Sequence, residues 1–254
     1  TALSPAQTEL ARPAPELGFG GVDLPATAQQ GEPLRVAARW LAFAPPAHDY
    51  TARWTLSGPA EFSAPADLAP ASPPTTWPGG SWVLGRAALP LPPDLPPGRY
   101  AIGLQLLTGA DEPIGEPIPV GEVEITGRAR AFEPPPMAVE LATTFGGQIK
   151  LWGYDLARTR HSITLIAQWG AITRPALDYK IFLHLLGADG LPVAQTDVMP
   201  RNYTYPTSHW LPGEVISDTL TLDLTGAPPG DYTLALGWYD PADPLQRLPA
   251  FAAD

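Results

Sequence analysis

An internal repeat constrains this sequence more than any other feature. A Trp-(x)-Pro-Gly motif and a following Pro-Pro-Gly-x-Tyr motif occur once in each half of the chain. Corresponding residues lie 132 or 133 positions apart, and they match Trp77 with Trp210, Gly98 with Gly230, and Tyr100 with Tyr232. Landmarks that recur at a fixed spacing are typical of two copies of one folding unit. We therefore expect a tandem repeat of one domain.

Composition indicates what kind of domain is repeated. The 254 residues include 24 glycines and 34 prolines, a content that approaches that of disordered segments. However, 44% of the residues are hydrophobic and eight are tryptophans, which favours packed cores. Both observations fit a domain of many short strands joined by Pro- and Gly-rich turns.

Alternation of apolar and polar residues marks the strands themselves. In the segment 177–186, Ile181 and Leu183 fall on one face, while Phe182 and His184 fall on the other. The segment 34–43 alternates in the same way, and no segment keeps a helical period. The large aromatics expected to be buried are Trp40, Trp54, Trp169 and Phe182.

The resulting prediction is an all-β chain of two tandem antiparallel β-sandwich domains, immunoglobulin-like or fibronectin type-III-like. A carbohydrate-binding jelly roll is the competing architecture. We expect a tail or linker over residues 1–17, a first sandwich over 18–127, a Pro-rich connector over 128–145 and a second sandwich over 146–254.

The net charge and the absence of cysteines limit the kinds of partner and metal site that this chain can have. The formal net charge of −11 disfavours nucleic acid, because an acidic surface repels phosphates. Without cysteines the chain forms neither disulfides nor thiolate metal sites. No apolar run reaches the roughly 18 residues of a membrane span, so we expect no direct membrane insertion by this segment. No signal-peptide pattern follows Thr1, which favours a mature piece or an excised domain.

The second half resembles a known kind of module. The segments that carry the resemblance are FGGQIKLWGYDL, DYKIFLHLLGADGLPVAQTD, YPTSHWLPGEVISDTLTL, PPGDYTLALGWYDP and RLPAF, between Phe145 and Phe251. They are similar to a soluble β-sandwich at the C-terminal end of multi-pass bacterial membrane proteins, glycosyltransferase-like proteins of the protein-mannosyltransferase type. The first half shares only the turn landmarks. The resemblance implies an extracytoplasmic domain, at the cell surface or in the periplasm, tethered through a membrane region that would carry the transfer chemistry. It supplies no catalytic or binding residues.

The sequence contains none of several common catalytic motifs. It has no Gly-x-Ser-x-Gly motif, phosphate-binding loop or His-Glu-x-x-His motif. Its four histidines lie on separate elements without metal-ligand spacing, and we interpret His184 as structural. We therefore expect no catalytic residues, no cofactor and no metal.

Several aspartates are candidate calcium ligands, since Ca²⁺ binds carboxylate oxygens. They are Asp189, Asp197, Asp240 and Asp243. Aspartate is also an ordinary turn residue, and no Asp-x-Asp-x-Asp run is present. We favour turns at these positions.

One segment concentrates aromatic side chains among polar ones. Tyr203, Tyr205, His209 and Trp210 lie within eight residues, and Trp238 and Tyr239 could be nearby. Aromatic faces beside hydrogen-bonding groups are the combination on which sugars stack. The competing interpretation is that Trp210 matches Trp77 and serves the fold. The candidate glycan-binding residues are Tyr203, Tyr205, His209, Trp238 and Tyr239, with Trp210 structural.

Three functional classes follow from these observations. We favour a non-catalytic extracytoplasmic interaction or spacer module that is part of a larger membrane-associated protein. A carbohydrate-binding module acting on cell-envelope glycans is the alternative, and an enzyme is the least favoured class. The expected partner is a glycan or another envelope protein, and the oligomeric state is left open.

Overall fold

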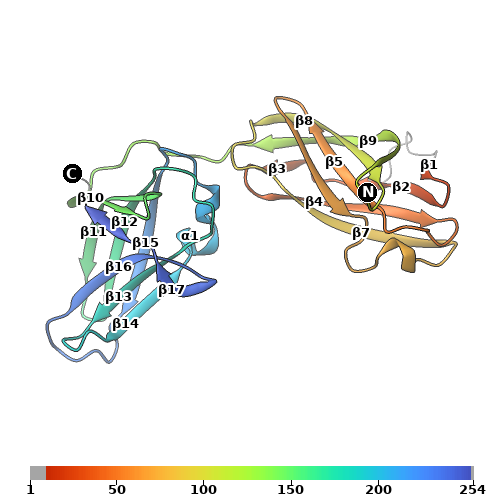
Figure 1. The fold of residues 1–254 in the computed structure, drawn as a ribbon. Coiled ribbons are helices and arrows are strands. Elements are labelled where there is room, and N and C mark those ends of the chain that lie inside the picture. The colour runs from red at the N-terminus through yellow and green to blue at the C-terminus, as the bar shows by residue number, and fades with distance from the viewer. Residues whose placement is uncertain (1–9, 253–254) are drawn as a thin grey trace. The chain divides into compact units, whose positions relative to one another are not determined.

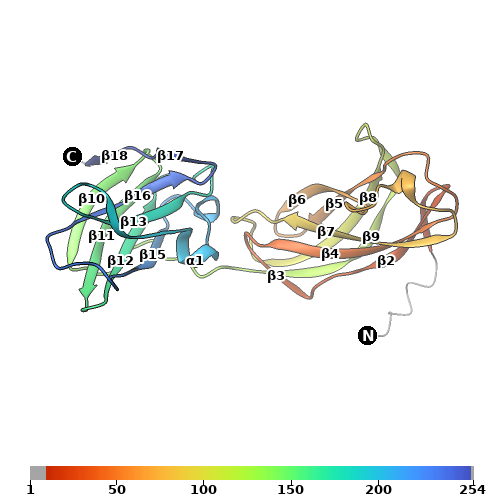
Figure 2. The ribbon, with the colours of Figure 1, turned by 90° about the horizontal axis from the view of Figure 1, so that it is seen from below.

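A computed structural model describes residues 10–252, and the chain divides into two compact units, Thr1–Arg128 and Ala129–Asp254 (Figure 1 and Figure 2). Each unit is nearly all β and has two sheets, with its own cluster of buried hydrophobic residues. The predicted all-β sandwich architecture is therefore confirmed.

The first unit has one sheet of four strands and one of five. The four-stranded sheet has the order β1-β2-β4-β7, formed by Ala11–Ala14, Leu17–Asp23, Pro33–Ala42 and Ser81–Pro90. The five-stranded sheet has the order β3-β9-β8-β5-β6, formed by Thr27–Gln29, Pro113–Thr126, Gly98–Leu107, Thr51–Ser57 and Glu61–Asp67. All pairings are antiparallel except that of β3 with β9.

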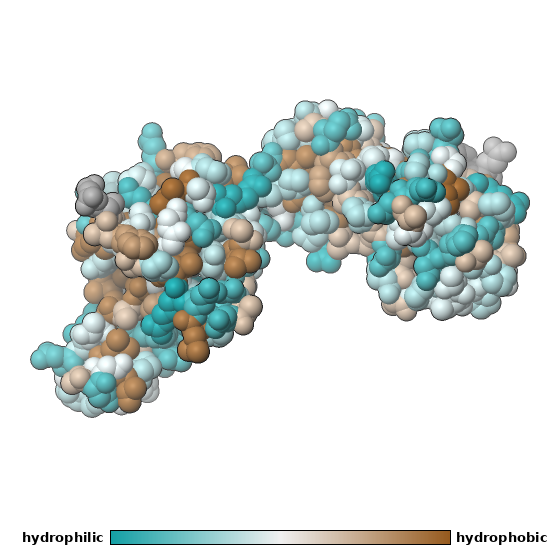
Figure 3. Space-filling view, viewed as in Figure 1, coloured by the Kyte–Doolittle hydropathy of each residue, from teal (hydrophilic) through white to brown (hydrophobic). Residues whose placement is uncertain are grey.

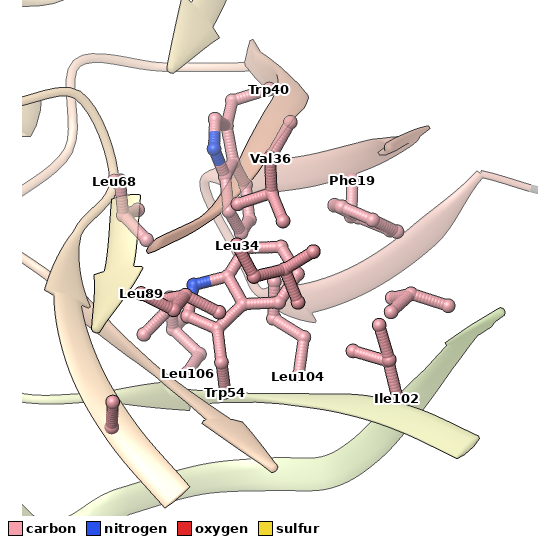
Figure 4. Packing of buried hydrophobic residues seen from close by; sticks show 14 of the residues in the cluster. Phe19, Leu34, Val36, Trp40, Trp54, Leu68, Leu89, Ile102, Leu104 and Leu106 are labelled. Carbon is pink, nitrogen blue, oxygen red and sulfur yellow. The ribbon is translucent and has the colours of Figure 1, made fainter. Parts of the chain in front are cut away.

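The core of the first unit comes from the faces that alternation predicted. Leu34, Val36 and Trp40 of β4 are buried, as is Trp54 of β5 in the opposite sheet. Figure 4 shows these side chains gathered with Leu104 and Leu106 between the strands. Replacing a buried tryptophan of this kind by alanine typically costs about 3–5 kcal/mol.

The second unit also has two sheets. One has the order β15-β12-β11-β10-β18, formed by Val215–Asp223, Ser162–Ala171, Ile149–Arg158, Val139–Phe145 and Ala250–Ala252. The other has the order β14-β13-β16-β17, formed by Pro192–Val198, Lys180–Leu186, Thr233–Asp240 and Asp243–Arg247. The remaining elements are one-turn segments, η2 (Pro74–Thr76) in the first unit, and α1 (Pro200–Tyr203) and η3 (Thr207–His209) in the second.

The strand arrangement is that of an immunoglobulin-type sandwich. In the first unit β2, β4 and β7 share one sheet and β5, β8 and β9 the other, which corresponds to the A-B-E and C-F-G grouping. The hydroxyl of Tyr100, in the F position, donates to the carbonyl oxygen of Pro96 at 2.8 Å. Tyr232 donates in the same way to Pro228. This local contact is the tyrosine corner of such folds.

The matched tryptophans also serve the fold. Trp77 and Trp210 each follow a 3₁₀ turn and are buried. Each indole N–H donates to a backbone carbonyl five residues earlier, from Trp77 to Ser72 at 2.8 Å and from Trp210 to Tyr205 at 3.2 Å. The structural interpretation of Trp210 is thus supported by geometry that both copies share.

Two segments differ from the sequence expectation. Residues 11–14, inside the expected tail 1–17, form β1, because an edge strand tolerates the prolines that suggested a tail. Residues 139–145, inside the expected connector 128–145, form β10 and pair with β11. Residues 1–9 of the expected tail lie outside the described residues.

Candidate functional site

The structure separates the five candidate glycan-binding residues. Tyr205 and Trp238 are fully buried. The Trp238 ring lies 4.8 Å from that of Trp169 and 5.7 Å from that of Trp210, measured between ring centroids, in the core of the second sandwich. Neither Tyr205 nor Trp238 offers a face to a sugar. The sequence pattern predicted both as exposed binding residues, but a cluster of aromatic residues in the sequence does not show which side chains face the core.

Tyr205 belongs to a buried polar network. Its hydroxyl donates to Oε1 of Glu214 at 2.6 Å and accepts from Nη1 of Arg130. Arg130 also forms an ion pair with Glu214, and both side chains are almost entirely buried. The carbonyl oxygen of His209 accepts from Arg130 at 3.3 Å. Tyr205 and the backbone of His209 therefore stabilise the fold of the second unit.

Tyr203 is placed differently, with 52% of its surface exposed. It ends α1, in which Arg201, Asn202 and Tyr203 have φ values of 47°, 52° and 66°. Consecutive non-glycine residues in this left-handed region are unfavourable, at roughly 1–2 kcal/mol each. Strained backbone of this kind concentrates at functional sites.

Asp218 of β15 anchors this turn from inside the unit. Its Oδ2 accepts from the backbone N–H of Arg201 at 2.9 Å, and the side chain is buried. Burial raises the pKa of the Asp218 carboxyl, because the charged form loses its hydration. The N–H of Arg201 opposes that shift by stabilising the carboxylate.

The exposed Tyr203 lies beside a group of side chains on the outer face of the sheet β14-β13-β16-β17. We call this group the outer-face cluster, and its members are Lys180, Phe182, His184, Asp197, Tyr203, Tyr239 and Arg247. Lys180 pairs across the sheet with Tyr239, and its Nζ lies 5.6 Å from the centre of the Tyr203 ring. Alternation along β13 predicted which of its residues face this side.

Phe182 forms the floor of the cluster. It packs over Gly237, its partner on β16, where an added Cβ would lie 2.6 Å from the ring. The Arg247 guanidinium sits 4.5 Å from the centre of the Phe182 ring, a cation–π arrangement, and only 7% of Phe182 is exposed. Phe182 is thus buried as expected, but beneath Arg247 and outside the sandwich core.

A small hollow of about 180 Å³ opens among these residues, lined by Phe182, His184, Gln195, Asp197, Tyr239, Pro244 and Arg247. His184 Nε2 lies 3.2 Å from Oδ2 of Asp197. Burial raises the pKa of Tyr239, and the negative charge of Asp197 and a hydrogen bond to it raise it further. The hollow therefore combines aromatic faces, a carboxylate, an imidazole and a guanidinium.

The lining of the hollow pairs an imidazole with a carboxylate, and it includes no serine, threonine or cysteine. Within residues 10–252 no group of three His, Asp or Glu side chains could hold a metal ion. Asp189, Asp240 and Asp243 each accept a hydrogen bond from the backbone N–H two residues further on, as turn aspartates do.

Comparison with known proteins gives no family for this chain. No family model matches it, and no curated protein matches its sequence. In the described part of the chain no helix has both the length and the apolar character needed to cross a membrane.

The members of the outer-face cluster that the sequence analysis did not propose as binding residues are Lys180, Phe182, His184, Asp197 and Arg247. Alternation on β13 was the available signal for Lys180 and Phe182. The partners Asp197 and Arg247 come from β14 and β17, and their approach depends on strand register. A single sequence does not reveal that register.

Proposed function

We propose that this chain is a non-catalytic interaction module that acts outside the cytoplasm as part of a larger membrane-associated protein. The outer-face cluster of the second sandwich is its recognition surface. The location and the membrane-bound parent rest on the sequence resemblance described above. The recognition role rests on the side chains of the cluster.

One observation carries the proposal: a strained turn holds the exposed Tyr203 over Lys180 and beside Tyr239. A surface loop with no function would adopt a common backbone conformation, because the left-handed region is unfavourable for residues other than glycine. Here the buried carboxylate of Asp218 holds the turn in place. Pre-organisation of this kind strengthens binding, since less conformational entropy is lost when the partner arrives.

Carbohydrate binding is the second candidate, and the chemistry of the hollow favours it. Tyr239 supplies an aromatic face in the hollow, while Asp197, His184 and Arg247 supply hydrogen-bonding groups. Tyr203, which is exposed on the same face of the sheet, adds a second aromatic ring nearby. Pyranose rings present apolar faces and hydroxyl edges that match such a surface. Cell-envelope polysaccharides are the ligand class to test.

The experiment compares the wild-type chain with a Tyr203→Ser/Arg247→Gln variant. A Trp82→Ser/Arg86→Gln variant is the matched control, because it removes an exposed aromatic residue and an arginine from β7 of the first unit. Each immobilised protein is exposed to a bacterial envelope fraction, and each is titrated calorimetrically with envelope glycans. Thermal melting verifies that all three proteins are folded.

A protein retained by the wild type and the control, but lost from the cluster variant, supports the interaction role. Heat of glycan binding that disappears in the cluster variant alone supports carbohydrate binding. Equal retention and equal heats for all three proteins would contradict a recognition role for the outer-face cluster.

A further inference from the structure

The two sandwiches differ in how they cover one edge of a central strand. In the first unit β9 pairs with β8 along its length, joining Gly98 to Ile125 and Tyr100 to Val123. The short strand β3 then adds to β9 from the other side. Strand β8 therefore has a neighbour on each side, because β5 pairs with its opposite edge.

Strand β16, the equivalent of β8, has a complete neighbour on one side only. It pairs with β13 from Thr233 to Tyr239, whereas β17 pairs only with Tyr239 and Asp240. No other strand within residues 10–252 pairs with Thr233–Gly237. We call this stretch the open edge of β16.

The backbone groups that face this edge can be assigned. The carbonyl oxygen of Trp238 accepts from Leu248 N–H at 2.9 Å, so Trp238 directs its backbone toward the β17 side. Along a strand, alternate residues direct their N–H and C=O groups to the same side. Leu236 and Leu234 therefore present theirs at the open edge.

The missing neighbour leaves core-facing side chains partly uncovered. Tyr100, Ile102 and Leu104 of β8 are buried, but Tyr232, Leu234 and Leu236 at the matching positions of the second unit are only half-buried. Leu156 of β11, across the opening, is 50% exposed. Figure 3 shows hydrophobic side chains, in brown, at the surface of this unit.

A cavity of about 700 Å³ lies at this end of the second sandwich, and we call it the end cavity. Ile163 and Leu185 are the buried residues of its lining, and Leu224 and Leu234 contribute half-buried apolar surface. In the first unit the residue before Pro96 is Leu95, which is buried, but before Pro228 the chain has the smaller Ala227. Arg158, Arg160 and Asp231 add polar groups to the lining. A cavity of this size with apolar walls and a few polar groups is typical of binding sites.

The open edge lacks the features that normally prevent a strand from pairing with other chains. Natural edge strands carry lysine, proline or a bulge at such positions. The sequence of the open edge is TLALG, without a charge or a proline, and its pairing with β13 is regular. The edge is therefore suited to accept another strand.

We propose that an extended segment of a partner protein adds antiparallel to the open edge of β16 and places its apolar side chains in the end cavity. The segment alternates apolar residues, which enter the cavity, with acidic residues, which face away from it, as β9 does in the first unit. Arg158 and Arg160 line the cavity and therefore lie on the side of its apolar residues.

Strand β9 shows what such a segment looks like. Its Val123 and Ile125 are buried in the first core, while Glu122 and Glu124 alternate with them and are exposed. The open edge of five residues spans about 17 Å, a length that one short extended segment covers. Strand addition of this kind obtains affinity from main-chain hydrogen bonds and specificity from alternate side chains.

The test titrates the intact chain with the synthetic peptide IPVGEVEIT, the sequence of residues 118–126. A peptide with both glutamates replaced by glutamine and a scrambled peptide are the controls. We expect one IPVGEVEIT peptide to bind per chain in calorimetry, and the scrambled peptide not to bind. Binding that is no tighter than that of the scrambled peptide would overturn the proposal.

Variants locate the site. Leu234→Gln places a polar group in the end cavity and should abolish binding, whereas Thr233→Gln, on the opposite face of β16, should not. Ala227→Leu refills the cavity and should also weaken binding, which keeps the test valid if Leu234→Gln does not fold. Arg158→Gln/Arg160→Gln changes the cavity side, away from the glutamates, and should alter the binding of the acidic and the glutamine peptide by the same factor.

Two further outcomes distinguish this proposal from others. Concentration-dependent dimerisation that Leu234→Gln prevents would show that a second copy of this chain, and not a different partner, occupies the edge, and would overturn the proposal. The Tyr203→Ser/Arg247→Gln variant should bind the peptide normally, because the outer-face cluster is on the other side of the sheet. The proposed function and this inference can therefore fail independently.

Discussion

At the scale of single residues, Gly98 and Gly230 follow the same Pro-Pro sequence but differ in conformation. Gly98 has a φ of 142°, and a Cβ there would lie 2.7 Å from Cγ of Pro59. Gly230 lies outside the left-handed region, and the nearest atom to a Cβ there is 3.7 Å away, on Tyr232. The repeat matches the two glycines in sequence, but their backbone conformations differ. Gly98 is fixed by pairing with β9, and Gly230 has no such neighbour.

Because of this difference, the same substitution at Gly98 and Gly230 should have unequal effects on stability. Gly98→Val should lower the free energy of unfolding of the first unit by about 1–3 kcal/mol, through backbone strain and the clash with Pro59. Gly230→Val should change that of the second unit by less than about 0.5 kcal/mol. Chemical denaturation of both variants measures this, and equal losses would contradict the explanation.

Asp218 should make the stability of the second unit depend on pH. Burial raises the pKa of its carboxyl in the folded state, so the protonated form favours folding. This stabilisation is fully present below the unfolded-state pKa of about 4 and is lost as the pH rises through the folded-state pKa. Asp218→Asn keeps a neutral acceptor for Arg201 N–H and removes the titration.

The measurement compares the free energies of unfolding of the wild type and Asp218→Asn across this pH range. The wild type should lose stability relative to the variant as the pH rises from about 4 towards neutrality. A difference between the two proteins that does not change with pH would exclude Asp218 as the source.

At the scale of elements, the buried ion pair of Arg130 and Glu214 fixes the segment that leads into the second sandwich. Ala131 next to it pairs with Val215 at the start of β15. Glu214→Gln removes the Glu214 carboxylate from the buried Arg130 guanidinium, and should destabilise the second unit by about 3–5 kcal/mol. Urea unfolding measures the loss.

A double variant, Arg130→Met/Glu214→Met, is the control for this pair. It removes both charges and keeps apolar volume, so it should recover much of the stability lost by Glu214→Gln. A double variant as unstable as the single one would show that packing, and not the uncompensated charge, explains the effect.

Strand faces could be predicted from the sequence, but strand neighbours could not. Alternation grouped Trp40 and Trp54 with the apolar faces of their strands, and both are in the core, because that pattern is internal to each strand. It could not show that Tyr205 turns inward or that the pairing of β17 with β16 reaches no further than Tyr239. Those features depend on register between segments far apart in the chain, and register leaves no local sequence pattern.

At the scale of the whole molecule, each unit contains what a sandwich needs to fold. The first has its own core around Trp40 and Trp54, and the second around Trp169, Trp210 and Trp238. Fragments 1–128 and 129–254, produced separately, should therefore each unfold in a single cooperative transition on heating. Circular dichroism measures this, and a fragment that remains unfolded at low temperature would contradict two self-sufficient units.

The central claim is that one sandwich design occurs twice and that only the second copy leaves its F-position strand open. Residue-resolved hydrogen exchange on the intact chain without ligand tests it most directly, because unpaired amides exchange fastest. Ile102 and Leu104 of β8 should be protected, as should Ala235 and Gly237, which face β13. Leu234 and Leu236 should exchange rapidly. Protection of Leu234 and Leu236 equal to that of Ile102 and Leu104 would contradict the claim.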